Sequence, residues 1–161
     1  ALVDETKTSV RSAIEEVRRI AQELRPQLLE HLGLVSALIE LSQTFAAQSG
    51  IEVERRFEVD LPELAPDAEL AVYRVTQESL TNVARHADAS HVVLSLEPGA
   101  GSVVLRVVDN GVGLAEPQPA NGAGGLRGMR ERAVLVGGAL AVKAAPEGGV
   151  EVRFEVPATA A

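Results

Sequence analysis

Residues 103–113 read Val103-Val-Leu-Arg-Val-Val-Asp-Asn-Gly-Val-Gly113, an apolar run followed by an acid, an amide and two glycines. The run Val103 to Val108 is typical of a buried strand. Asp109 would therefore lie at a strand end, where a ligand crevice can open. Its carboxylate accepts hydrogen bonds from amine donors, and the glycines let backbone approach a ligand closely. Taken alone, an Asp-x-Gly sequence more often marks a tight turn.

A second glycine-rich segment follows, Gly124-Gly-Leu-Arg-Gly-Met-Arg-Glu-Arg132. Its glycines free the backbone to wrap phosphates, and the helix that starts here offers N–H groups that favour anions. Arg127 and Arg130 add positive charge. The segment lacks the Gly-Lys-Ser/Thr of a Walker loop, and it is not a Rossmann glycine motif after a first strand. It therefore indicates a different nucleotide-binding fold.

A third segment, Glu78-Ser-Leu-Thr-Asn82, lies on a predicted helix from Pro66 to about His86. Glu78 and Asn82 are four residues apart and so share one helix face. Carboxylate and amide oxygens suit Mg²⁺, which also bridges phosphate oxygens. In isolation an ordinary exposed polar pair is the better interpretation. The order and spacing of all three segments together predict a site for ATP and Mg²⁺.

Residue periodicity predicts the rest of the domain. Alternation over Ile51–Val59 predicts a half-buried strand, and Gly50 is expected to cap a preceding helix. The fold class is therefore α+β, a two-layer sandwich with helices on one face of a mixed, mainly antiparallel sheet. Residues 115–124 are expected to form a mobile loop that orders over bound phosphates, and Ala158–Ala161 to fray. The further predicted elements are helices over 34–45 and 126–136 and strands over 91–96, 103–108, 140–144 and 150–156.

The first residues form a predicted amphipathic helix. Val3, Val10, Val17 and Leu24 recur at seven-residue intervals, and Arg25-Pro26 should end the helix. The stripe packs either on its own domain or in a two-chain bundle, and the pattern alone leaves both open. A short turn or helix over Gln27–Leu32 follows. Because the chain starts without Met inside this predicted helix, we expect it to be a fragment of a longer protein.

Composition narrows the class of protein. The 161 residues suit about one domain, and three Phe and one Tyr imply an aliphatic core. A net charge of −8 argues against nucleic acid as a partner. Without cysteines, disulfides and thiolate metal sites are excluded.

No signal or membrane-spanning pattern occurs, so we expect a soluble, cytoplasmic chain without membrane contact. His31 and His91 favour surface or packing roles, and His86 a capping role near the site.

The three segments together resemble the ATP-binding domain of sensor histidine kinases, in the superfamily of gyrase, Hsp90, histidine kinase and MutL ATPases. Glu78–Ala87 is similar to the N box, Val107–Leu114 to the first glycine box and Gly124–Arg132 to the second. The Gly-Leu-x-Gly-Met-Arg-Glu-Arg form resembles the nitrate-sensor subclass. The resemblance implies a Bergerat-type ATP-binding fold over 34–161. It also implies that 1–33 is a partial dimerisation and phosphotransfer helix with its linker.

The resemblance also implies roles for individual residues. Asn82 would coordinate Mg²⁺, with Glu78 as a catalytic acidic residue beside the metal. Asp109 would bind the adenine amine, and Arg85 would offer charge to a phosphate. The glycine boxes supply the remaining predicted nucleotide-binding residues, which are Gly111 and Gly113 at the base and Gly124, Gly125, Leu126 and Gly128 at the phosphates.

The activity that the resemblance implies is phosphoryl transfer from Mg-ATP to a histidine, and then to an Asp of a response regulator. The parent protein would be a homodimer, either cytoplasmic or the cytoplasmic part of a membrane-bound sensor. A histidine followed by an acidic residue, the phosphoacceptor box, is absent, so this fragment should not phosphorylate itself. Two alternatives stay open. One is another ATPase or serine kinase of the superfamily acting on an anti-anti-sigma partner, and the other is an interaction module with a vestigial nucleotide site.

Overall fold

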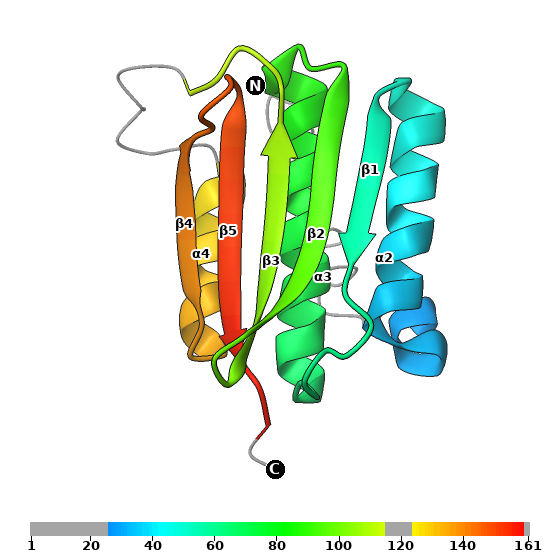
Figure 1. Cartoon of the computed structure of the whole chain (residues 1–161), viewed down its shortest axis with the longest axis vertical. Coiled ribbons are helices and arrows are strands. Elements are labelled where there is room, and N and C mark those ends of the chain that lie inside the picture. The colour runs from blue at the N-terminus through cyan, green and yellow to red at the C-terminus, as the bar shows by residue number, and fades with distance from the viewer. Residues whose placement is uncertain (1–25, 115–123, 160–161) are drawn as a thin grey trace, which may run out of the picture.

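The computed structural model describes residues 26–114 and 124–159, which form a helical layer against a sheet (Figure 1). The predicted N-terminal stripe over residues 1–25 and the loop over 115–123 lie outside the described residues. In chain order the elements are α2 (Gln27–Ser49), β1 (Glu52–Phe57), α3 (Pro66–Asn82), the π-helical turn η1 (Val83–Ala87), β2 (His91–Gly99), β3 (Ser102–Asp109), α4 (Gly124–Leu135), β4 (Ala139–Ala144) and β5 (Val150–Pro157).

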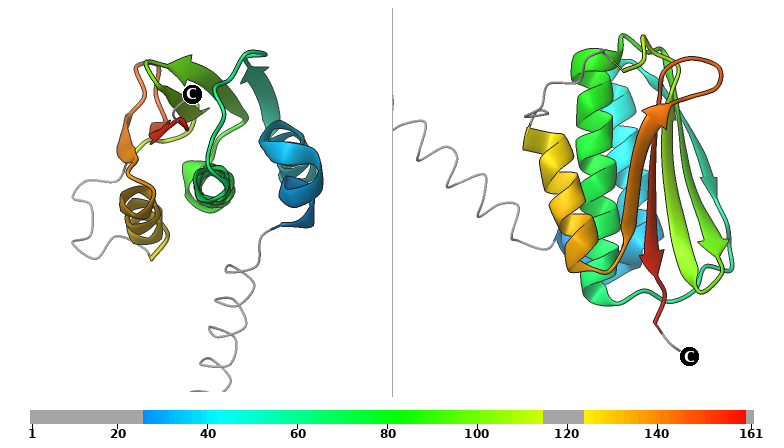
Figure 2. Two further views of the ribbon diagram at one scale, coloured as in Figure 1. Left: turned by 90° about the horizontal axis from the view of Figure 1, so that it is seen from below. Right: turned by 90° about the vertical axis from the view of Figure 1, so that its left-hand side faces the viewer.

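The strands form a mixed sheet in the order β1-β2-β3-β5-β4. β1 pairs with β2 in parallel, and the other neighbours pair antiparallel. Figure 2 shows α2, α3 and α4 on one side of this sheet. The predicted α+β sandwich, with a mainly antiparallel sheet and helices on one face, is confirmed.

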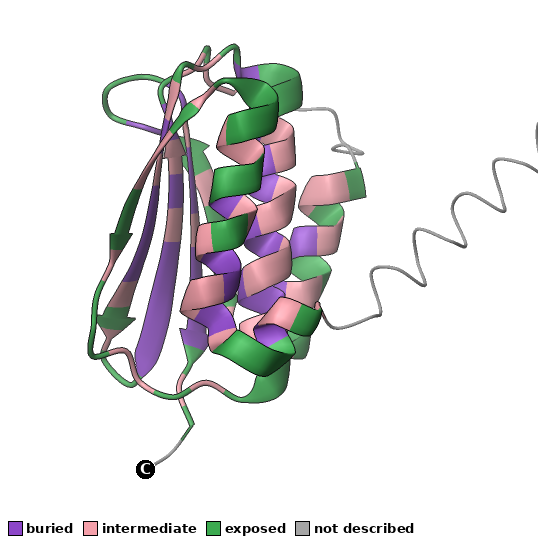
Figure 3. Cartoon of the chain, turned by 90° about the vertical axis from the view of Figure 1, so that its right-hand side faces the viewer, coloured by how far each residue is buried: buried purple, intermediate pink, exposed green. Residues whose placement is uncertain are grey.

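The core between the two layers is aliphatic, as the composition predicts. Alternate residues of the central strands face the helices, and Figure 3 shows the buried residues concentrated on the facing sides of both layers. Phe154 of β5 is the large aromatic side chain at its centre and is fully buried. Around it pack residues from both layers, among them Leu38, Val72, Val75, Leu80, Leu94, Leu96, Leu105 and Met129.

Helix α2 starts earlier than the apolar pattern alone indicates. It runs from Gln27 and includes the predicted short segment, with a kink at Gly33, where φ is 80°. Leu29, before the kink, is buried in the core. At its other end Gly50 adopts the left-handed conformation and donates its N–H to Ala46, so the predicted cap is confirmed. Within the described residues no helix combines the length and apolarity that crossing a membrane requires.

Three predicted boundaries were wrong. β1 ends at Phe57, and Val59, predicted to be part of that strand, is 94% exposed. The α-helix predicted to reach His86 ends at Asn82 and continues as η1. Ala158 and Thr159 are held rather than frayed, because their N–H groups donate to the carbonyls of Gly101 and Glu63.

Candidate functional site

The three sequence segments meet at one end of the molecule, where α3 and β3 end and α4 begins (Figures 1 and 2). Because β2 and β3 pair antiparallel, β3 ends beside the start of β2, at the same end of the sheet. Helix α3 packs against the sheet, and its last turns place Glu78 and Asn82 near that end. The glycine-rich start of α4 is placed beside them.

The start of α4 touches the last turns of α3. A Cβ on Gly125 would overlap the carboxylate of Glu78, so the missing side chain makes room for that group. One turn further along α4, the buried sulfur of Met129 lies 3.7 Å from the hydroxyl of Ser79. The same hydroxyl donates to the carbonyl of Val75. Segments 78–82 and 124–132 are thus in direct contact, and the buried Met129 anchors α4 against α3 behind the polar groups.

Asp109 is the buried carboxylate of the site, with 5% of the residue exposed. Its Oδ1 accepts the N–H of Gly111 at 2.8 Å. This bond occupies one oxygen and fixes the carboxylate at the end of β3, and a carboxylate has further acceptor positions.

Asn110 has a structural role that the sequence does not indicate. Its side-chain oxygen accepts the N–H groups of Ser90 and His91, both at 3.0 Å. Its amide group donates to the Ser90 hydroxyl at 3.0 Å, and its backbone N–H donates to the His91 carbonyl. Asn110 therefore ties the end of β3 to the start of β2, immediately beside Asp109.

The π-helical turn η1 completes this side of the site. The carbonyl of Ala87 accepts the N–H of Val112 at 2.8 Å. A Cβ on Gly111 would overlap the Ala87 backbone, so the glycine is needed for this packing within the protein. Single π turns are frequent at functional sites. Arg85 and His86 are exposed on this turn.

Gly149, in the turn between β4 and β5, also belongs to the site. It is buried with φ of 87°, and a Cβ there would overlap the carbonyl of Asp109 and approach its Oδ1. A Cβ on Gly113, where φ is 85°, would lie 3.6 Å from the Gly149 carbonyl oxygen. The strands predicted over 140–144 and 150–156 leave Glu147–Gly149 only as the turn between them. Nothing local to it signals that this turn lies beside Asp109, at the end of the neighbouring strand β3.

The other predicted nucleotide-binding residues surround this centre. Leu126 packs against the core and so helps anchor the first turn of α4. Arg127 is 81% exposed and bonds Glu131 at 2.8 Å, which raises the pKa of its guanidinium. Gly124 faces open space, and the Arg132 guanidinium lies beside Gly128. The roles of these residues toward a ligand stay predictions.

The histidines away from the site behave as packing or surface groups. His31 is exposed on α2. His91 is half-buried, and its Nε2 lies 3.7 Å from a carboxylate oxygen of Glu54. Both positions agree with the roles predicted for them.

The donor set at the end of α3 fits a magnesium ion shared with a ligand. Glu78 and Asn82 supply hard oxygen atoms from adjacent turns of one helix. In residues 26–114 and 124–159, no group of three or more His, Cys, Asp or Glu side chains is placed to hold a metal. Mg²⁺ commonly binds through one or two protein oxygens together with substrate phosphates, so a small donor set is what such an ion uses.

Comparison with protein families and curated sequences gives concordant results. Residues 67–160 match the family described as histidine kinase-, DNA gyrase B-, and HSP90-like ATPase. The chain is 33% identical over 158 residues to the signal transduction histidine-protein kinase/phosphatase DegS of Brevibacillus brevis, covering 98% of the chain and 41% of DegS. It is 35% identical over 147 residues to the oxygen sensor histidine kinase NreB of Staphylococcus carnosus, covering 91% and 42% respectively.

Solved structures agree with this assignment. The histidine kinase domain of a blue-light activated histidine kinase from Erythrobacter litoralis superposes with a TM-score of 0.65 at 24% identity, covering 77% of this chain and 60% of that one. Full-length ShkA, crystallised with AMPPNP, has a TM-score of 0.65 at 30% identity, covering 80% and 30%. The resemblance to sensor histidine kinases predicted from the three segments is confirmed.

The contact of Gly149 with Asp109 gives a first prediction. Gly149→Ala should destabilise the fold by about 2–4 kcal/mol, because left-handed strain of about 1–2 kcal/mol adds to an overlap with backbone. Gly101→Ala is the matched control, since its φ is also positive at 71° but nothing lies within 4 Å. Gly101→Ala should lose only about 1–2 kcal/mol of stability, which is what the left-handed strain costs. Urea unfolding measures both, and equal losses would contradict the contact.

Proposed function

We propose that this chain, which belongs to the histidine kinase-, DNA gyrase B- and HSP90-like ATPase family, holds Mg-ATP for phosphoryl transfer to a histidine outside the chain. The observation that carries the proposal is the convergence of Glu78, Asp109 and Gly125 at one end of the fold. The chain spans about two fifths of the length of the DegS and NreB relatives. The activity proposed for the whole protein therefore rests on this site and on homology.

Asp109 is the proposed anchor for the adenine base. One carboxylate oxygen is already fixed by the Gly111 N–H, and the carboxylate accepts the exocyclic amine through its remaining acceptor positions. Gly113, next to the β4–β5 turn, lets the backbone pass close to the base without a side chain between them. The base is thus held at the end of β3, and the phosphates point toward α4.

The phosphate end of ATP is proposed to lie between α3 and the start of α4. The first N–H groups of α4 favour anions there, and Arg85 on η1 adds positive charge. Asn82 and Glu78 are the proposed protein donors for Mg²⁺. When bound, Mg²⁺ neutralises charge on the phosphates. In phosphoryl transfer, positioning and electrostatic stabilisation supply most of the rate enhancement, so the task of Glu78 is to orient groups at the metal.

The histidine that accepts the phosphoryl group is proposed to lie on another segment of the parent protein. This chain contains His31, His86 and His91, and none is followed directly by an acidic residue. The fragment therefore should not phosphorylate itself. In the parent protein, residues 1–33 are the proposed dimerisation helix and linker, joined firmly to the domain because Leu29 is buried in its core.

The proposed partners follow from this arrangement. The parent protein acts as a homodimer in the cytoplasm, and the phosphoryl group passes from histidine to an Asp of a response regulator. A superfamily ATPase acting as a serine kinase would use the same nucleotide site with a different acceptor. The two are separated by the chemistry of the phosphorylated product.

The proposed adenine contact predicts the effect of a conservative change. Asp109→Asn should weaken binding of AMPPNP roughly 10- to 100-fold, because losing a charge-assisted hydrogen bond costs about 1.5–3 kcal/mol. Calorimetry with and without Mg²⁺ measures this. Asn82→Ala is the companion variant. It should bind AMPPNP as well as the unmutated chain when metal is absent, and it should lose most of the increase in affinity that Mg²⁺ gives. Undiminished binding by Asp109→Asn, or no binding by the unmutated chain, would sink the proposal.

The proposed acceptor predicts the product of a longer chain. A chain of the parent protein that carries a histidine followed by an acidic residue should incorporate radiolabel from ATP as acid-labile, base-stable phosphate. The same chain with Asp109→Asn should incorporate little. Acid-stable phosphoserine on a separate protein, with no label on the chain itself, would instead favour the serine kinase.

A further inference from the structure

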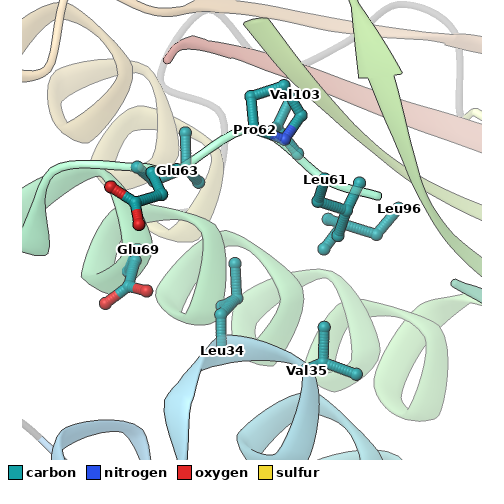
Figure 4. A pocket seen from close by; sticks show the side chains of 9 residues that line it. Leu34, Val35, Leu61, Pro62, Glu63, Glu69, Leu96 and Val103 are labelled. Carbon is teal, nitrogen blue, oxygen red and sulfur yellow. The ribbon is translucent and has the colours of Figure 1, made fainter. Parts of the chain in front are cut away.

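A pocket lies at the opposite end of the molecule from the proposed nucleotide site. It is a pocket of about 380 Å³ between the first half of α2, the β1–α3 connection, the end of β2 and the start of β3 (Figure 4). Helix α3 begins beside it and ends at Glu78 and Asn82, so the two sites lie at opposite ends of one helix. None of the residues predicted to bind nucleotide lines this pocket.

The floor of the pocket is apolar. Leu34 and Val35 come from α2, Leu61 from the connection, Leu96 from near the end of β2 and Val103 from the start of β3. Pockets that take small groups commonly enclose about 300–1,000 Å³ and are lined mainly by apolar side chains. This pocket is at the lower end of that range, which suits one or two side chains of a partner.

The wall formed by the β1–α3 connection is fixed in place. The carbonyl of Glu63 accepts the N–H of Thr159 at 2.8 Å and the hydroxyl of Thr159 at 3.1 Å. The neighbouring residue, Ala158, donates to the Gly101 carbonyl of the β2–β3 turn at 3.0 Å. The end of the described chain thus fastens two walls of the pocket together. A ligand would meet a pocket that is already formed.

The mouth of the pocket is acidic. In Figure 4 the carboxylates of Glu63 and Glu69 lie on one side, away from the apolar side chains of Leu34 and Leu61. Further acids lie along the same connection and the first turn of α3, namely Glu58, Asp60 and Asp67. Residues 27–54 and 57–73 contain no Lys or Arg. The acids of these two stretches therefore favour cations over anions as ligands.

We propose that this pocket binds a segment of a partner protein in which an apolar side chain stands next to Lys or Arg. The apolar side chain fills the floor, and the cationic group lies at the exposed Glu63 on the acidic rim. Lys and Arg suit such a site because their aliphatic stems cover apolar surface while their charged ends stay at the rim. The complementary charges give the site its selectivity. Binding here needs no nucleotide, so the proposal is independent of the one for Mg-ATP.

The test uses short peptides capped at both ends, Arg-Leu-Arg-Leu-Arg and its acidic counterpart Glu-Leu-Glu-Leu-Glu, added to the isotope-labelled chain without nucleotide. Backbone amide shifts are followed by NMR. The basic peptide should shift the amides of Leu61, Glu63, Leu96 and Val103 in a saturable way. The acidic peptide should leave them unchanged.

A conservative variant separates specific docking from general attraction to an acidic protein. Glu63→Gln should weaken the basic peptide about threefold, as expected for losing one exposed ion pair. Glu52→Gln, an exposed acid at the start of β1, is the matched control and should change nothing. Equal shifts with both peptides, shifts centred elsewhere, or equal weakening by both variants would overturn the proposal.

Discussion

The geometry of the candidate site depends on a backbone contact between two connections that are distant in sequence. The Ala87 carbonyl accepts the Val112 N–H at 2.8 Å, and Gly111 fits against Ala87 without space for a side chain. This contact fixes where the chain goes after β3. The Asp109 carboxylate is then held by the Gly111 N–H, and the β4–β5 turn closes over it through Gly149.

The same packing explains why three modest sequence signals act together. Glu78 lies one turn before the end of α3, and η1 continues that helix to Ala87. The start of α4 leans on Glu78 through Gly125. The polar groups proposed to hold the base, the phosphates and the metal are therefore attached to one buried framework of aliphatic side chains. A site built on such rigid elements holds its groups in fixed relative positions, which is what phosphoryl transfer requires.

Much of this could be predicted from sequence because the signals are local. Alternation of apolar and polar residues indicates strands, and Gly50 marks the end of a helix. An acid and glycines directly after an apolar strand indicate a strand end that faces a ligand. The features that escaped prediction depend on tertiary contacts. The π turn exists where Ala87 must meet Val112, and Gly149 matters because folding brings it to Asp109. In each pair the two residues are far apart in the sequence, and no local pattern indicates that they meet.

The most direct test of the account is an NMR titration of the isotope-labelled chain with AMPPNP and Mg²⁺, following every assigned backbone amide. Amides in 78–82, 109–113 and 124–129 should shift together with one shared dissociation constant, while those around Leu61 and Val103 should not shift. Shifts confined to one of the three segments, or different constants for each, would contradict a single nucleotide site.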